Sequence, residues 1–350
     1  MHEIVRQRVR QAIDERIFPA CVVGWIDGNG SENIVAEGSM TYEDLTPVTR
    51  ESIFDIASIT KAIPGSCALM QLVDEGKLSL DDRLVEFVPE FGNLPGKGDV
   101  RIRHLLTYTL NLQVPAMSSL KNLRAPELLR FVIEAPLKNT PGSSFFYTNS
   151  TALFFGLVVR KVCGMTLDAY AQEHFFDPLG MGRTTFHPER FSQDEIVPTE
   201  IDEWRGGLVR GVVHDESSYI LREHYIGGTA GLFSTVPDLL RFARMLLSGG
   251  VQRGVRYFSP EMIREMYTNQ LGAIGASAGL GWELSDETRM GRYAPELFGK
   301  TGFTGCVILI NPSKRRALVI LSNRVYPKRP NDAGSGINHV RRDIADIIFA

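Results

Sequence analysis

The sequence predicts an α+β protein whose single antiparallel β-sheet is built from both ends of the chain. Near the N-terminus, Ala20 to Ile26 and Asn33 to Glu37 flank the turn sequence Asp-Gly-Asn-Gly, which is typical of a β-hairpin. Near the C-terminus, Cys306 to Ile310 and Ala317 to Leu321 flank Asn-Pro-Ser-Lys and indicate a second hairpin. Residues from about Leu80 to Tyr225 have a mainly helical pattern, so strands occur at both ends and helices between them.

Helices are predicted to flank the sheet at both ends of the chain. Residues 1–10 read as an amphipathic helix, and Ile337 to Phe349 as a final one. The apolar face expected for the first helix consists of Ile4, Val5, Val9 and Ile13.

We expect two domains. A discontinuous sheet domain comprises residues 1–79 and 226–350, and a mainly helical domain comprises residues 80–225. Residues 187–225 have little regular pattern, and loops of that length inside a compact domain are usually functional or disordered. We expect them to form a wall that faces the substrate. The alternative is a structural excursion over the helical domain.

Composition excludes several functional classes. The 350 residues have a formal net charge of −3, so no nucleic-acid partner is expected. No apolar run approaches the roughly 18 residues of a membrane span. The N-terminus lacks the apolar core of a signal peptide, which favours a cytoplasmic protein. The four cysteines are far apart and read as reduced core residues, and the scattered histidines predict no metal site. No cofactor is expected.

A Ser-x-x-Lys motif at Ser58 and Lys61 is the first candidate for catalysis. A serine hydroxyl needs a base within hydrogen-bond reach, and residues three apart share a face of a helix. We expect Ser58 to open a helix that ends near Gly76 and is kinked at Pro64. The same motif recurs at Ser118, which we interpret as a loop serine. An ordinary helix-capping serine is the alternative for Ser58.

Tyr147 and Asn149 form the second motif, on a loop just before a helical run at Ala152 to Val162. A tyrosine acts as a base near neutral pH only when its pKa is lowered, and nearby lysines lower it. A core tyrosine beside two phenylalanines is the alternative. The second copy of the motif begins at Tyr267 in an amphipathic segment, and we assign that tyrosine to packing.

The third motif begins the C-terminal hairpin. Lys300 and Thr301 are followed by Gly302, which is expected to leave room for a substrate along the strand edge. The N–H of Phe303, with that of Ser58, would then stabilise an oxyanion. A solvated lysine at the start of a strand is the alternative for Lys300.

In this order and spacing the three motifs resemble those of class C β-lactamases and penicillin-binding proteins, over about residues 18–326. The resemblance implies a β-lactamase/transpeptidase-like fold and a serine hydrolase. It implies that Ser58 is the nucleophile, that Lys61 is its activating partner, and that Tyr147 is the general base and the acid for the leaving group. Asn149 would contact the substrate amide or the lysine. Lys300 and Thr301 would bind a substrate carboxylate or modulate Tyr147.

A subgroup is also suggested. The segments Pro198-Thr199-Glu200, Trp204-Arg205, Arg210-Gly211 and Val213-His214-Asp215-Glu216 resemble bacterial penicillin-binding protein 4B-like proteins linked to muropeptide cleavage.

The exact reaction stays open between β-lactam, D-alanyl peptide, muropeptide amide and ester hydrolysis, with an esterase or peptidase favoured. The substrate is expected to be a small molecule or a peptide or muropeptide, and Lys300 favours a carboxylate near the scissile bond. The oligomeric state is not predicted. One alternative is a catalytically inactive binding protein on the same fold. The other is an α/β-hydrolase that uses Ser277 of a Gly-x-Ser-x-Gly sequence, although its flanks are rich in glycine.

Overall fold

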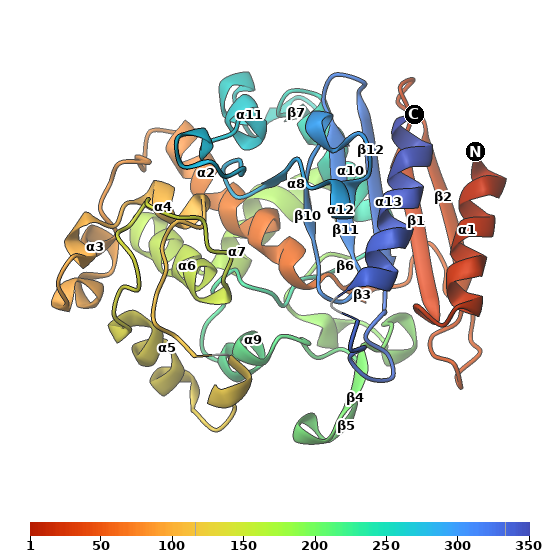
Figure 1. The fold of residues 1–350 in the computed structure, drawn as a ribbon, viewed down its shortest axis with the longest axis horizontal. Coiled ribbons are helices and arrows are strands. Elements are labelled where there is room, and N and C mark those ends of the chain that lie inside the picture. Colours follow the sequence, from red (N-terminus) through yellow and green to blue (C-terminus); the bar gives the residue numbers. More distant parts are fainter. Residues whose placement is uncertain (116, 333) are drawn as a thin grey trace.

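A six-stranded antiparallel sheet organises the computed structural model, which describes residues 1–115, 117–332 and 334–350 and all their side chains except those of residues 117 and 118. Its strand order is β2-β1-β12-β11-β10-β9. The bounds are β1 (Ala20–Ile26), β2 (Glu32–Gly38), β9 (Glu283–Leu284), β10 (Phe298–Thr301), β11 (Val307–Asn311) and β12 (Arg316–Ser322). The first hairpin joins the last strand directly, because β1 pairs with β12 from Cys21↔Ser322 to Ile26↔Ala317. The predicted α+β class and the sheet built from both termini are confirmed (Figure 1).

Helices cover both faces of this sheet. On one face, α1 (His2–Asp14) and α13 (Ser335–Phe349) lie side by side (Figure 1) and pack on alternate strand residues such as Val23. On the other face lies α10 (Val236–Leu247), so close that a Cβ on Gly24 would be 2.3 Å from Val236 Cγ1.

One residue of the predicted apolar face of α1 was assigned wrongly. Val5 and Val9 are buried as expected, but Ile4 is 55% exposed. Ala12 completes the buried stripe instead, because it lies three residues after Val9 and therefore on the same face of the helix.

The middle of the chain is mainly helical. Its helices are α2 (Cys67–Asp74), α3 (Leu84–Phe87), α4 (Ile102–Leu106), α5 (Ala125–Glu134), α6 (Asn149–Cys163), α7 (Leu167–Ala171), α8 (Asp177–Leu179) and α9 (Glu216–Leu221). Further along are α11 (Pro260–Tyr267) and α12 (Glu287–Met290). Three short strand pairs complete the fold: β3 (Phe54–Asp55) with β6 (Phe233–Ser234), β4 (Glu200–Asp202) with β5 (Gly207–Val209), and β7 (Val251–Gln252) with β8 (Val255–Arg256).

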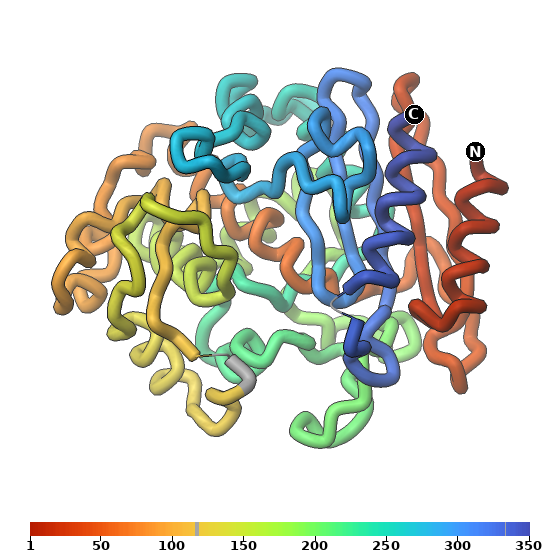
Figure 2. Tube along the Cα trace, in the orientation of Figure 1, coloured from red at the N-terminus to blue at the C-terminus, as the bar shows by residue number. Residues whose placement is uncertain are grey.

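Residues 187–225 have more regular structure than their sequence pattern predicted. They contain the β4–β5 hairpin, which projects from the body of the molecule in Figure 1, and helix α9. Figure 2 traces this segment in green along the lower edge of the view. The hairpin is tied to the C-terminal region by a hydrogen bond from Ile201 N–H to the carbonyl of Pro327 (2.8 Å).

Within the described residues, no single helix has both the length and the apolar character needed to cross a membrane. The helical stretches Asn149–Cys163 and Leu167–Leu179 meet those criteria only when taken together, and they are bent by 76° relative to each other.

Candidate active site

The Ser-x-x-Lys motif lies on a single tight turn. Residues Ala57–Lys61 form a 3₁₀ helix, and the path to α2 is interrupted at Ile63, whose φ of −117° and ψ of 109° are not helical. The interruption that was predicted at Pro64 is therefore present, and it separates this turn from α2. The side chain of Lys61 is fully buried, and its Nζ lies 2.9 Å from both Ser58 Oγ and the carbonyl oxygen of Thr229. The predicted contact between serine and lysine is present.

A buried carboxylate holds this turn in place. Asp55 Oδ1 accepts a hydrogen bond from Ala57 N–H (2.8 Å), and Oδ2 accepts one from His214 N–H (2.7 Å). Ala57 has a φ of +47°, a left-handed conformation that is costly for a residue other than glycine. Burial raises the pKa of Asp55, and the backbone donors from Ala57 and His214 oppose that rise. Asp55 thus links the nucleophile turn to the segment 187–225.

Tyr147 lies between two lysines just before α6. The Nζ atoms of Lys300 and Lys61 are 4.4 Å and 5.4 Å from the centre of its ring. Burial of the hydroxyl favours the neutral form, but Lys300 and then Lys61 favour the phenolate and together hold the pKa of Tyr147 below its usual value. A hydrogen bond with Ser58 acts in the same direction. The ring is 40% exposed, so Tyr147 is not a core residue.

The ammonium group of Lys300 is already paired. Its Nζ lies 2.9 Å from Glu283 Oε1, and the side chain is 1% exposed. Burial raises the pKa of Glu283, but Lys300 outweighs this and the pKa is lowered. Thr301 Oγ1 donates to the same carboxylate (3.0 Å). Of the two predicted roles for Lys300 and Thr301, this arrangement favours modulation of Tyr147 over direct binding of a substrate carboxylate.

Asn149 is the first residue of α6 and faces a partner that the sequence did not indicate. Its Nδ2 donates to Asp215 Oδ2 (2.7 Å), and its carbonyl accepts from Thr229 Oγ1 (3.2 Å). The hydroxyl of Thr148 caps the helix by accepting from Ser150 N–H. The amide of Asn149 is thereby fixed at the rim of the cavity that contains Ser58.

Gly302 is also required for a reason that the sequence did not indicate. A Cβ at this position would lie 2.5 Å from the carbonyl oxygen of Ile56, so the absence of a side chain allows β10 to approach the segment that carries Ser58. The next residue, Phe303, is 48% exposed, and His214 stacks on its ring at 5.6 Å.

These residues surround a cavity of about 490 Å³. Ser58, Tyr147, Asn149, Thr301, Gly302 and Phe303 line it together with residues outside the three motifs: Asp215, Glu216, Glu283, Arg289, Arg324, Arg329, Asn338 and Arg341. The three predicted motifs are therefore brought together at one cleft. The side chain of Lys300 is not part of its lining.

Arg341 is the most informative of the residues that sequence reasoning missed. It is 4% exposed and donates to the carbonyls of Gly302 (2.7 Å) and Cys306 (2.8 Å). Among the described residues its Nε has no partner, its Nη1 donates to Asn338 Oδ1 (3.0 Å), and none of the hydrogen bonds of its guanidinium is to a carboxylate. Burial lowers its pKa to about 10. A signal was available, because Arg341 interrupts the apolar stripe of α13 between Ile337 and Ile344.

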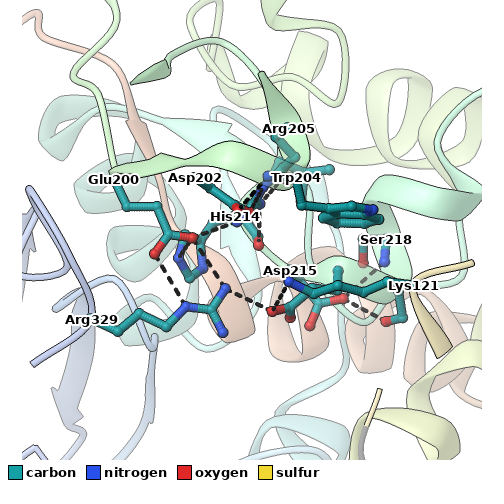
Figure 3. Close-up of polar contacts among 12 residues, drawn as sticks. Lys121, Glu200, Asp202, Trp204, Arg205, His214, Asp215, Ser218 and Arg329 are labelled. Atoms are coloured by element: carbon teal, nitrogen blue, oxygen red, sulfur yellow. Dashed lines mark hydrogen bonds and ion pairs between the residues drawn. The ribbon is translucent and has the colours of Figure 1, made fainter. Parts of the chain in front are cut away.

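A buried ionic cluster braces the wall formed by residues 187–225 (Figure 3). The side chain of Arg205 is 1% exposed, pairs with Glu200 and with Asp202 (2.7 Å), and donates to the carbonyl of His214. Arg329 bridges Glu200 (3.1 Å) and the Glu216 carboxylate (2.7 Å) across the cavity rim. Burial raises the pKa of Glu200, but His214 and Arg329 lower it to about 2.

The other sequence candidates lie outside this site. Ser277 is exposed on an irregular segment after a 3₁₀ turn, and the sheet is antiparallel, so the strand–serine–helix arrangement of an α/β-hydrolase is absent from the described residues. That alternative was wrong. The side chain of Ser118 lies outside the described residues. Tyr267 packs against Phe298, with ring centres 5.5 Å apart. In the part of the chain that the structure describes, no group of three or more His, Cys, Asp or Glu side chains is placed to hold a metal ion.

The antiparallel sheet with flanking helices, and the cleft in which a serine contacts a lysine near a tyrosine, define a serine hydrolase of the kind the motifs resemble. A family model described as Beta-lactamase matches residues 5–340, and the chain belongs to that family. A curated relative from Escherichia coli (strain K12), named "Putative D-alanyl-D-alanine carboxypeptidase", is 31% identical over 336 residues, which cover 86% of this chain and 77% of the relative.

Solved structures have the same fold. The octameric penicillin-binding protein homologue from Pyrococcus abyssi is 25% identical, with a TM-score of 0.74 and coverage of 92% of this chain and 73% of that one. EstCE1, described as a hydrolase with promiscuous acyltransferase activity, is 22% identical, with a TM-score of 0.75 and coverage of 96% and 97%. At that identity EstCE1 supports the fold alone.

Proposed function

We propose that this protein cleaves an ester or an amide through an acyl-enzyme formed on Ser58. The observation that carries the proposal is the contact of 2.9 Å between Lys61 Nζ and Ser58 Oγ, beside a tyrosine whose pKa is lowered by two lysines. A serine hydroxyl becomes an effective nucleophile only when a base lies within reach, and Tyr147 is the proposed base.

In the acylation step, Ser58 Oγ attacks the carbonyl carbon of the substrate and gives its proton to Tyr147, while Lys61 stabilises the phenolate that receives it. The negative oxygen of the tetrahedral intermediate accepts hydrogen bonds from the N–H groups of Ser58 and Phe303. When the intermediate collapses, the bond to the alcohol or amine breaks, and Tyr147 returns the proton to that leaving group.

In the deacylation step, water attacks the ester carbonyl and gives a proton to Tyr147. Ser58 Oγ leaves and regains this proton, so the enzyme is restored and a carboxylic acid is released. Lys300 supports both steps because its positive charge stabilises the phenolate of Tyr147, and Glu283 holds Lys300 in position. Asn149, fixed by Asp215, is placed to contact the carbonyl-side amide of a bound substrate.

A substrate with a carboxylate near the scissile bond is the more specific candidate. Arg341 is the residue that supports this candidate, because a buried guanidinium without a carboxylate partner among the described residues is a strong anchor for an anion. Asn338 lies one turn earlier on α13 and lines the same cavity. A peptide ending in D-alanine has this carboxylate, and the name of the E. coli relative supports the same class.

The proposal is tested by comparing two serine variants with a p-nitrophenyl ester and with a D-alanyl-D-alanine peptide. Ser58→Ala should abolish turnover of both substrates, whereas the matched control Ser277→Ala should keep wild-type rates. Equal loss in both variants, or full activity in Ser58→Ala, would contradict the assignment of the nucleophile. Wild-type protein without turnover and without covalent labelling of Ser58 would favour a catalytically inactive binding protein.

A further inference from the structure

A second cavity lies behind the catalytic one. It has a volume of about 530 Å³, within the range of small-molecule sites, and it lies between the segment 187–225 and residues 225–233, partly open to solvent. Its lining combines polar and charged side chains, among them His187, Glu189, Arg222 and Glu223, with an apolar set formed by Leu153, Phe186, Val212, Val213, Leu221 and Ile226.

The charged side chains at this second cavity are already engaged with one another. Arg222 pairs with Glu223 (3.2 Å), and His187 lies 3.3 Å from Glu189 and 3.0 Å from Asp168. A charged ligand group would have to displace these contacts. The chemistry of the lining therefore fits an uncharged, apolar group rather than an ion.

Only a thin partition separates the two cavities. Ala230 lines both of them and is 6% exposed, and its side chain is a single methyl group. The preceding residue, Thr229, accepts the hydrogen bond from Lys61 Nζ, and the same Nζ contacts Ser58 Oγ, each at 2.9 Å. Ala230 therefore directly follows the residue whose carbonyl oxygen, like Ser58 Oγ, contacts the catalytic lysine.

We propose that the second cavity receives the apolar tail of the acyl group carried by Ser58. The tail would pass Ala230 and bury its methylene groups against Val212 and Ile226, and each buried methylene favours binding. The inference rests on the proposed acyl-enzyme and concerns the acyl half of the substrate, whereas the carboxylate proposed for Arg341 is on the leaving half. It adds a second substrate class beside the D-alanyl peptides: esters or amides of medium-length, unbranched apolar acids.

The test measures kcat/KM for a series of p-nitrophenyl esters from acetate through butyrate, hexanoate and octanoate to decanoate. Two variants change the cavity in opposite directions. Val212→Phe fills it, and Ile226→Ala enlarges it; both residues are half-buried and lie outside the catalytic contacts. The matched control is Leu208→Phe, in the same segment but 50% exposed and outside the cavity lining.

We expect Val212→Phe to lower kcat/KM for octanoate by at least about tenfold while acetate stays within about twofold of wild type. Ile226→Ala should move the preferred chain toward decanoate, and Leu208→Phe should leave the profile unchanged. General destabilisation cannot produce opposite shifts in chain length. If the esters are hydrolysed but all three variants keep the wild-type profile, the acyl-tail site is refuted and the acyl-enzyme is not. Failure of every ester together with an unlabelled Ser58 refutes the proposed function itself.

Discussion

Lys300 Nζ lies 4.4 Å from the centre of the Tyr147 ring while it forms an ion pair of 2.9 Å with Glu283. The lysine therefore acts on the tyrosine through space, and the glutamate moderates that action. Lys300 lowers the pKa of Tyr147, whereas Glu283 raises it. Two substitutions at this pair should accordingly shift the same titration in opposite directions.

The pH dependence of kcat/KM tests that relationship. If Tyr147 must be ionised to accept the proton, the rate rises with pH through its pKa. The double variant Lys300→Met, Glu283→Gln removes the cation without leaving a buried carboxylate unpaired, so the pKa should rise and the ascending limb should move to higher pH. Glu283→Gln alone should move it to lower pH. Identical limbs in the wild-type and variant proteins would contradict the proposed role of Lys300.

Substitution of Lys61 or Tyr147 should lower kcat far more than substitution of the matching residue in the second copy of each motif. Lys61→Ala and Tyr147→Phe should each lower kcat by about 10²–10⁴-fold, the usual contribution of a positioned acid or base. Tyr267→Phe and Lys121→Ala serve as controls and should retain wild-type kcat; Lys121 is the lysine of the second Ser-x-x-Lys sequence, which begins at Ser118. Steady-state kinetics on one ester decides the matter, and near-wild-type turnover in Tyr147→Phe would remove that residue from the mechanism.

A methyl group at position 302 should disturb the turn that carries the nucleophile. Gly302→Ala places a Cβ 2.5 Å from the carbonyl oxygen of Ile56, and overpacking of this kind typically costs about 1–3 kcal/mol. Denaturant unfolding should show that loss, and the rate of Ser58 labelling should fall with it. Gly182→Ala is the control, because no atom lies within 4 Å of its added Cβ. Unchanged labelling in Gly302→Ala would show that β10 and the nucleophile turn are not coupled.

The ionic cluster around Glu200 should make stability depend on acid pH. The pKa of Glu200 falls from 4.5 to about 2 on folding, so its contribution is complete above the unfolded pKa and is lost as pH falls through the folded one. At neutral pH, Glu200→Gln should cost about 3–5 kcal/mol, as expected when one partner of a buried ion pair is removed. The difference in unfolding free energy between wild type and variant should shrink as pH falls below 4.5. A difference that is constant with pH would show that Glu200 is not ionised in the cluster.

Local sequence patterns predicted the frame of the molecule well. The bounds of β1 match those expected, and the turn chemistry placed both hairpins, because strand alternation and turn residues act over a few positions. The phase of α1 was misjudged at Ile4, since the small Ala12 carries little hydrophobic signal although it is fully buried. The break after Lys61 was expected from Pro64, but the hydrogen bond from Lys61 Nζ to the carbonyl of Thr229 depends on tertiary contacts that no local pattern encodes.

In the candidate site too, some residues could be predicted from local sequence patterns and others could not. Ser58, Tyr147 and Lys300 belong to short motifs whose residue types are required by the chemistry, so they are visible in one sequence. The segment of Asp215 was noted only through a subgroup resemblance and Glu283 was not noted at all, because both act through partners that only the fold brings near: Asp215 contacts Asn149 from 66 positions away. Single acidic residues of this kind are common on any surface, and only their burial and geometry single them out.

Covalent labelling of the intact protein with a fluorophosphonate, followed by peptide mapping, would identify the nucleophile. We expect one adduct, on Ser58, which is absent from Ser58→Ala and unchanged in Ser277→Ala. Competition by a penicillin for the same residue would extend the site to mimics of acyl-D-alanine. An adduct on Ser277, or no adduct in folded wild-type protein, would contradict the assignment of Ser58 as the nucleophile.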